Sequence, residues 1–215
     1  MPSALTQFFQ HHATNLPDPR LLHYELPAWI RFDLQGPLSP KDAGYFAQVL
    51  HRATTLFAAA FAPTDEVLLV YQEHRYKRHR IRSNSYLFRQ LGIRKRDVTF
   101  QKRWARPSQL AYHEGRWIQA LYTTLAARIP YRTLLAAISY QDFPDQNKTA
   151  IHGLFYFFNQ TTGLIFYMYD DRGILVSSNT PEITRPLYQE YNDWILDFDR
   201  GTIDALFSEA ASTKS

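Results

Sequence analysis

The chain of 215 residues contains no cysteine, only eight glycines and no long apolar run. Without cysteine there are no disulfides, thiolate metal ligands or thiol nucleophiles, so a disulfide-stapled secreted scaffold is not expected. The few glycines form no phosphate-binding loop, Gly-x-Ser-x-Gly elbow or dinucleotide fingerprint. The longest apolar run, residues 56–62, is too short to cross a bilayer, and residues 1–16 lack a signal-peptide pattern. We therefore expect a cytoplasmic protein that does not interact with membranes.

Positive charge, by contrast, is plentiful and unevenly placed. Of the 24 Lys and Arg residues, twelve lie between His74 and Arg106, where Asp97 is the one acidic residue. This segment carries +11 and the rest of the chain −7, which gives +4 overall. Such a field attracts polyanions or acidic protein surfaces and concerns partners rather than fold. The residues that we predict to contact a partner are Arg75, Lys77, Arg78, Arg80, Arg82, Arg94, Lys95, Arg96, Lys102, Arg103 and Trp104.

Three interpretations of this basic segment stay open. Arg outnumbers Lys nine to three, which favours bidentate recognition of carboxylates on an acidic protein or of phosphates. Aromatic residues interleaved with arginine also suit single-stranded nucleic acid, with guanidinium groups on phosphates and rings beneath bases. The third interpretation is a solvated face that pairs internally with the acidic remainder of the chain. The interleaved aromatic residues are Tyr76, Tyr86, Phe88, Phe100 and Trp104.

Hydrophobic periodicity predicts a mixture of strands and helices. A helix is expected from Pro40 to about Ala62, with Ser39 as its N-cap, because apolar residues recur there at helical spacing. Alternating and fully apolar runs predict a strand on either side of it, at 29–34 and 66–72. Further strands are expected at 98–104, 117–126, 154–158, 164–169 and 174–177, and further helices at 83–91, after Pro130, after a Thr184 cap and at 202–211.

These elements point to an α+β fold in a single domain. We expect a mixed or antiparallel sheet with helices packed mainly on one face. Residues 1–25 are predicted to form an N-terminal helix or lead-in, 26–200 the core, and 201–215 a C-terminal helix with a polar tail. The aromatic residues Tyr188, Tyr191 and Trp194 are expected to share one helix and to pack into the core.

The last third of the chain contains the most distinctive motifs. One is the hairpin Tyr169-Asp170-Asp171-Arg172-Gly173, and the other is the ending Trp194-Ile195-Leu196-Asp197 followed by Asp199-Arg200. With these motifs the chain resembles a bacterial family of unknown function, number 3885 in the series of such domains. The resemblance implies a single-domain cytoplasmic α+β protein. It implies no catalytic residue, because no activity is established for the family.

The adjacent carboxylates of Asp170 and Asp171 are the sharpest candidate for chemistry. Paired aspartates between two apolar strands are typical of nucleotidyl-transfer sites that hold two metal ions. Met168, however, stands where the polymerase motif Tyr-x-Asp-Asp has tyrosine, and no third carboxylate is evident on a neighbouring strand. The alternative is a structural turn in which Asp170 accepts backbone N–H groups and Arg172 pairs with a carboxylate.

Taken together, these observations favour a binding protein over an enzyme. We expect a non-enzymatic bacterial binding protein, of the immunity or antitoxin kind or accessory to a conflict system. It would dock an acidic protein partner through a basic, aromatic-rich face. The alternative is a nucleic-acid-binding protein that uses the same His74–Arg106 segment. A metal-dependent enzyme that uses Asp170 and Asp171 is the third hypothesis, and no cofactor is expected.

Overall fold

The strands of the described residues form one antiparallel sheet. The computed structural model describes residues 3–12, 26–75, 85–104, 116–143, 145, 151 and 153–212. The sheet order is β1-β7-β6-β5-β2-β4-β3, and each neighbouring pair is antiparallel. This confirms the predicted α+β class and the antiparallel option for the sheet. The strands are β1 Ala28–Asp33, β2 Glu66–Arg75, β3 Thr99–Trp104, β4 Arg116–Leu125, β5 Leu154–Asn159, β6 Ile165–Met168 and β7 Gly173–Ser178.

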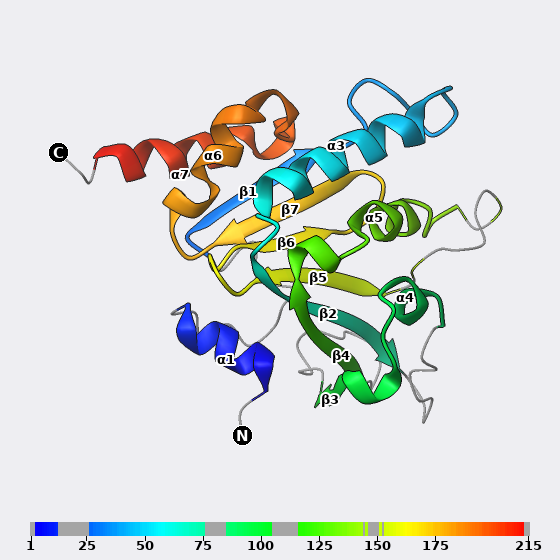
Figure 1. The fold of residues 1–215 in the computed structure, drawn as a ribbon. Helices are drawn as coiled ribbons and strands as arrows, with labels where there is room; N and C mark the ends of the chain where they lie inside the picture. The colour runs from blue at the N-terminus through cyan, green and yellow to red at the C-terminus, as the bar shows by residue number, and fades with distance from the viewer. Residues whose placement is uncertain are drawn as a thin grey trace.

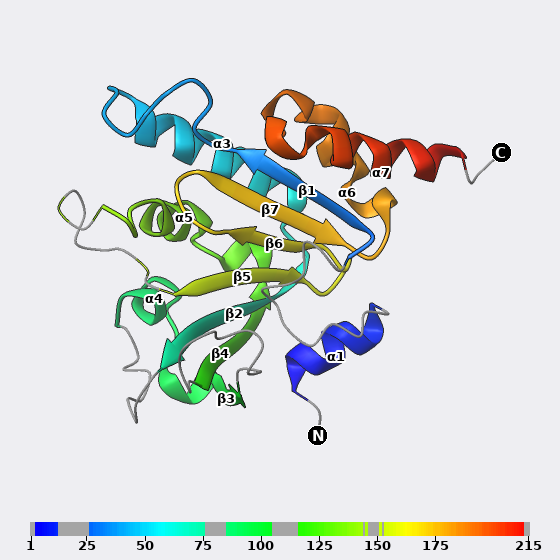
Figure 2. The same ribbon diagram turned by 180° about the vertical axis from the view of Figure 1, so that it is seen from behind.

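The helices lie mainly on one face of this sheet, as predicted. Figures 1 and 2 show α3 running across that face, with α5 beside it, whereas α1 lies against the opposite face. The helices are α1 Ala4–His11, α3 Tyr45–Ala60, α4 Ser85–Gln90, α5 Tyr131–Ser139, α6 Pro181–Glu190 and α7 Arg200–Ser212. Short 3-10 turns are η2 Lys95–Asp97, η4 Ala126–Arg128, η5 Asn192–Trp194 and η6 Asp197–Asp199.

The central strand β5 explains why both faces need cover. Successive side chains of a strand point to opposite faces, and β5 is apolar at both. Phe155 and Phe157 belong to the main core beneath α3 and α5, whereas Tyr156 and Phe158 belong to a second cluster. Phe8 of α1 covers that second cluster, with its ring centroid 5.0 Å from that of Phe158. The N-terminal helix is therefore a structural lid on the sheet.

The helix predicted from Pro40 begins later, so that prediction was wrong at its start. Asp42 does accept hydrogen bonds from the Ser39 backbone (2.7 Å) and hydroxyl (2.8 Å), but this contact closes a separate turn. Gly44 then adopts a left-handed conformation (φ 87°) and precedes α3 as its N-cap. Because glycine takes positive φ readily, the chain reverses there and the helix starts at Tyr45.

The helix predicted to start at Thr184 begins instead at Pro181, with Thr180 as its N-cap residue. Thr184 is buried within α6, and Pro186 also lies inside this helix rather than in its first turn. Proline at the first helical position has no amide hydrogen to lose, which is why Pro181 is the better start. The three aromatic residues do not share one helix: Tyr188 lies in α6, Tyr191 caps it, and Trp194 lies in η5.

The two ends of the sheet are finished differently. At β1, Phe32 forms an isolated bridge with Ile195, and the Leu196 amide donates to the Arg31 carbonyl at 2.8 Å. The segment after α6 therefore lines the outer side of β1. At the other end, β3 pairs only with β4 among the residues that the structure describes.

Candidate functional site

The Tyr169–Gly173 hairpin joins β6 to β7 and lies close to the backbone of β1. Gly173 faces Asp33 in the β1–β7 register, and the Leu34 amide donates to the Arg172 carbonyl at 3.0 Å. A Cβ atom on Gly173 would lie 2.8 Å from the Phe32 carbonyl oxygen and 2.6 Å from Cζ of Tyr169. Glycine is therefore required at this position because the backbone of β1 and the Tyr169 ring approach it so closely.

Asp170 is engaged by the arginine of its own turn. Its Oδ1 accepts the Arg172 amide at 2.8 Å, and its Oδ2 accepts Nε of Arg172 at 2.8 Å and also Nη2. The Asp170 side chain is 5% exposed and that of Arg172 is 64% exposed. The hydrogen bond to Asp170 is also the main reason that the pKa of Arg172 is raised. This is the structural turn that the sequence offered as one interpretation.

Asp171 is engaged from α3. The Tyr45 hydroxyl donates to Oδ2 of Asp171, and Nε2 of Gln35 donates to the Tyr45 oxygen at 2.7 Å. Burial raises the pKa of Asp171 above its usual value, and the Tyr45 hydrogen bond opposes that rise only in part. Burial and the contact with Asp171 likewise raise the pKa of Tyr45. The buried pair therefore joins the hairpin to the first turn of α3.

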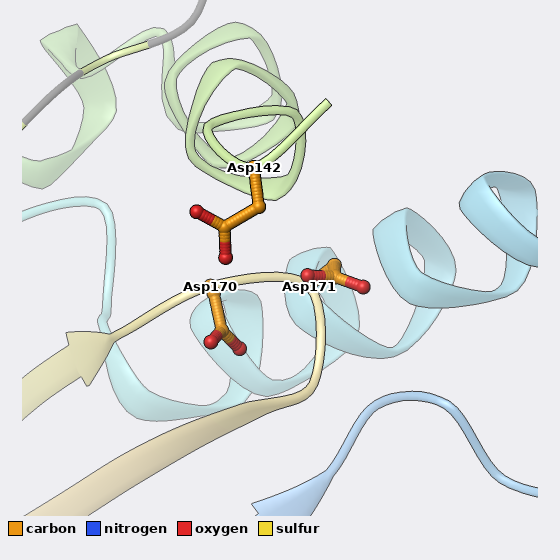
Figure 3. Close-up of side chains that lie close together, drawn as sticks. All are labelled: Asp142, Asp170 and Asp171. Carbon is orange, nitrogen blue, oxygen red and sulfur yellow. The ribbon is translucent and has the colours of Figure 1, made fainter. Parts of the chain in front are cut away.

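A third carboxylate approaches those of Asp170 and Asp171. It belongs to Asp142, an exposed residue in the turn after α5. One carboxylate oxygen from each of Asp142, Asp170 and Asp171 lies within 4.8 Å of the others. In Figure 3, Asp142 projects toward the hairpin, whereas the Asp170 and Asp171 side chains leave the hairpin in different directions. The neighbouring Gln141 donates its side-chain amide to the Tyr169 carbonyl, which holds the two segments together.

The hydrogen bonds from Arg172 and Tyr45 limit the chemistry that the three aspartates can perform. A divalent cation prefers deprotonated carboxylate ligands whose oxygens are available. Here both Asp170 oxygens accept hydrogen bonds from Arg172, and Asp171 accepts one from Tyr45 while burial raises its pKa. A metal ion would have to compete with Arg172 for the Asp170 oxygens and with Tyr45 for Oδ2 of Asp171. The geometry thus favours a structural role for the hairpin.

The predicted basic segment lies at the opposite end of the sheet, near β3. Five of its cationic side chains are exposed, and we call this set the basic face: Arg89, Arg94, Lys95, Arg96 and Lys102. Arg89 lies on α4, Arg94 to Arg96 lead into and form η2, and Lys102 lies on β3. The structure therefore places four residues of the predicted site, from a turn and a strand, near Arg89, which belongs to the basic segment but was not among the predicted contact residues.

Strand register adds further positive residues at the same end. Arg75 of β2 pairs with Arg116 of β4, and Arg116 pairs in turn with Trp104 of β3. Arg103 precedes Trp104 in that row. Arg116 was not in the predicted set, because only strand pairing brings it beside Arg75. The predicted contact residues Lys77, Arg78, Arg80 and Arg82, together with Tyr76, lie outside the described residues.

The acidic residues nearest the basic face are already engaged. Asp97 accepts the Arg94 amide at 2.8 Å, and its carboxylate lies 3.9 Å from Nε of Arg96. Glu73 accepts the Tyr71 hydroxyl at 2.5 Å. Both members of the Arg96–Asp97 pair are exposed, and exposed ion pairs of this length contribute little stability. Asp97 and Glu73 therefore neutralise only a small part of the charge of the basic face.

Three aromatic side chains of this segment, those of Tyr86, Phe88 and Phe100, pack inward. Phe88 is buried, Tyr86 and Phe100 are half-buried, and all three pack against the main core. Phe88 and Phe100 meet edge to face at 6.4 Å, and the Lys95 ammonium lies 5.9 Å from the Phe100 ring centroid. These three rings are therefore used for packing, and the exposed side chains that the structure describes here are cationic or polar.

Comparison with known proteins matches nearly the whole chain to one family, whose description is "Domain of unknown function (DUF3885)", over residues 5–199. The chain belongs to this family. The resemblance inferred from its motifs is therefore confirmed. A curated relative of the DUF3885 chain is the "Uncharacterized protein YnaE" of Bacillus subtilis (strain 168), which is 39% identical over 69 residues. That alignment covers 30% of this chain and 32% of the relative, and no solved structure matches.

Two parts of the DUF3885 chain escaped the sequence prediction. Asp142 was not predicted as a neighbour of Asp170, because it comes from a turn after a helix and not from a neighbouring strand. Tyr45 was expected only as an apolar position of a helix, although its hydroxyl reaches Asp171. Among the described residues, no helix combines the length and apolar character that crossing a membrane requires.

Proposed function

We propose that this DUF3885 protein is a non-enzymatic binding protein that docks an acidic protein partner in the cytoplasm through its basic face. The observation behind the proposal is the exposure of Arg89, Arg94, Lys95, Arg96 and Lys102 at one end of the sheet. Complementary charge accelerates encounter and selects partners, and arginine adds bidentate bonds to carboxylates. An immunity- or antitoxin-like protein would use such a face to cover an acidic patch on the molecule it neutralises.

A protein partner is favoured over nucleic acid by the position of the three aromatic rings that the structure describes in this segment. Proteins that bind single strands without sequence preference stack bases on exposed aromatic side chains. Tyr86, Phe88 and Phe100 instead pack against the core of this protein. Carboxylates need only the guanidinium and ammonium groups that the face presents, so an acidic protein surface matches these side chains better.

The enzyme hypothesis has weaker support from the geometry. A catalytic carboxylate must be available to a substrate or metal ion. Here, however, Asp170 accepts hydrogen bonds from Arg172, and Asp171 accepts one from Tyr45. Asp171→Asn keeps the size of the side chain and an acceptor for Tyr45. We expect this variant to retain any partner binding, because the hairpin lies at a distance from the basic face along the strand order.

The test is a quantitative pull-down from the lysate of the native host. The wild-type chain is compared with Arg94→Glu/Arg96→Glu and with a control of equal charge change, Lys41→Glu/Arg128→Glu, whose two side chains are exposed elsewhere. Each lysate is divided into nuclease-treated and untreated halves and washed at low and high salt. We expect one stoichiometric acidic protein to survive nuclease treatment, and its recovery to fall about tenfold or more only with the face variant.

Two results would contradict the proposal. Equal recovery of the partner by the face variant and by the control would show that the basic face is not the contact surface. Nucleic acid recovered only from the untreated half at low salt would move the function to phosphate binding, whose affinity falls steeply with salt because counterions are released.

A further inference from the structure

The outer edge of β3 differs from that of β1 at the far end of the sheet. The β1 edge is lined by Ile195 and Leu196, through a bridge to Phe32 and a hydrogen bond to Arg31. Within the described residues β3 has β4 as its single strand neighbour, so its other side ends the sheet. An edge strand presents alternate backbone N–H and C=O groups that can pair with another chain.

Positive charge lies on and just before this edge strand. Lys102 lies on β3 and is exposed, and Arg94 to Arg96 lie just before the strand begins. Alternation along the strand places Phe100 and Lys102 on the face covered by the main core, whereas Gln101 lies on the other face, where its amide donates to Gln119 at 2.5 Å. Lys102 therefore projects from the core face of this edge strand, the face on which the Lys95 ammonium lies 5.9 Å from the Phe100 ring centroid.

These charges determine which strand the edge accepts. A second copy of β3 would bring another strand of the same positive charge to this edge, and like charges on adjacent strands are destabilising. Lysine on an edge strand is a common device against such self-association. An acidic strand is favoured at this edge instead, because its carboxylates are attracted to the cationic side chains. The same residues thus exclude a second copy and select an acidic segment.

We propose that an extended acidic segment of the partner adds to the outer edge of β3 as a further strand. This inference rests on the proposed function and specifies its contact. β3 spans Thr99–Trp104, and six strand residues extend about 20 Å, which is a common length for an added strand. Backbone hydrogen bonds supply the affinity, while Lys102 and the arginines of the basic face supply the preference for acidic side chains.

The probe is an eight-residue peptide of alternating Glu and Val, titrated onto the full-length chain. Two control peptides each change one property: a Lys–Val peptide has the opposite charge on the same backbone, and a Glu–Val peptide with alternate backbone nitrogens methylated keeps the charge but lacks those N–H donors. The readout is peptide affinity together with hydrogen exchange of the β3 amides. We expect the unmodified Glu–Val peptide to slow exchange in β3 and to bind about tenfold or more tighter than either control.

A protein variant tests the charge preference in the same assay. Lys102→Glu is expected to weaken Glu–Val binding several-fold and to strengthen Lys–Val binding, whereas Lys41→Glu changes neither. Equal binding of the methylated peptide would overturn strand addition while leaving docking by the basic face intact. Failure of the Glu–Val peptide to bind, or complete protection of β3 in the free protein, would also overturn it. Loss of partner recovery in the pull-down remains the separate test of the proposed function.

Discussion

Substituting Gly173 by alanine tests whether the hairpin is as closely packed as its geometry indicates. The new methyl group would meet the Tyr169 ring at 2.6 Å and the Phe32 carbonyl at 2.8 Å, well inside van der Waals contact. Phe32 cannot retreat easily, because it pairs with Ile174 in the β1–β7 ladder. Tyr169 must therefore swing out of its site, and we expect the free energy of unfolding to fall by about 3 kcal/mol.

The matched control is Gly201→Ala in α7, where a new Cβ meets no atom within 4 Å. Alanine in a helix is favoured over glycine by about 0.5–1 kcal/mol, so this variant should be slightly more stable than the wild type. Urea denaturation measures both free energies. In thermal unfolding, a loss of 3 kcal/mol corresponds to a decrease in Tm of about 6–12 °C for a chain of this length.

A second substitution locates the strain. The Tyr169 hydroxyl is the atom closest to the added Cβ, so Tyr169→Phe in the Gly173→Ala background should recover part of the lost stability. The same change in the wild-type background should cost less than about 1 kcal/mol, and the difference is the coupling energy of the pair. Equal stability of Gly173→Ala and Gly201→Ala would refute the reasoning, because the close approach of β1 would then carry no cost.

Two further predictions concern the buried pair between the hairpin and α3. Tyr45→Phe removes the hydroxyl that joins Gln35 to Asp171. The free energy of unfolding, measured in urea, should fall by about 1–3 kcal/mol. An unchanged free energy of unfolding would contradict a stabilising hydrogen bond between Tyr45 and Asp171. Asp171→Asn tests pH dependence: a raised pKa means that this carboxyl favours folding at low pH and that the benefit is lost as pH rises through its folded pKa. The wild type should therefore lose stability relative to Asp171→Asn as the pH rises above about 4, the ordinary pKa of an aspartate, and a constant difference would show that burial does not shift this group.

Much of the fold could be predicted because local pattern decides it. The apolar runs at β2 and β5 and the turns at Asn159–Gly163 and 170–173 mark strands regardless of what they pair with. Helix starts were less predictable, since Ser39 and Pro40 form an attractive start signal that Gly44 overrides with its positive φ. A start signal describes local preference, whereas the true start depends on where α3 must cross the sheet.

The candidate sites show a similar division. The turn between Asp170 and Arg172 was one of the predicted interpretations, because it depends only on two residues that lie two positions apart in the chain. The approach of Asp142 and the pairing of Arg75 with Arg116 depend on tertiary structure and on strand register, which no single-sequence pattern encodes. The inward packing of Phe88 and Phe100 was also beyond the pattern, because interleaved aromatic residues look the same whether they face the core or the solvent.

The pairing of β1 with β7 has a consequence for how the chain is made. Ala28 pairs with Ser178, so the partner of β1 leaves the ribosome 150 residues after β1 itself. At synthesis rates of about 5–20 residues per second, β1 waits roughly 8–30 seconds for its neighbour. During that interval the apolar side chains of Ile30 and Phe32 have no strand to pair beside. Nascent chains from which β7 has not yet emerged should therefore be the species that chaperones hold and that proteases cut first.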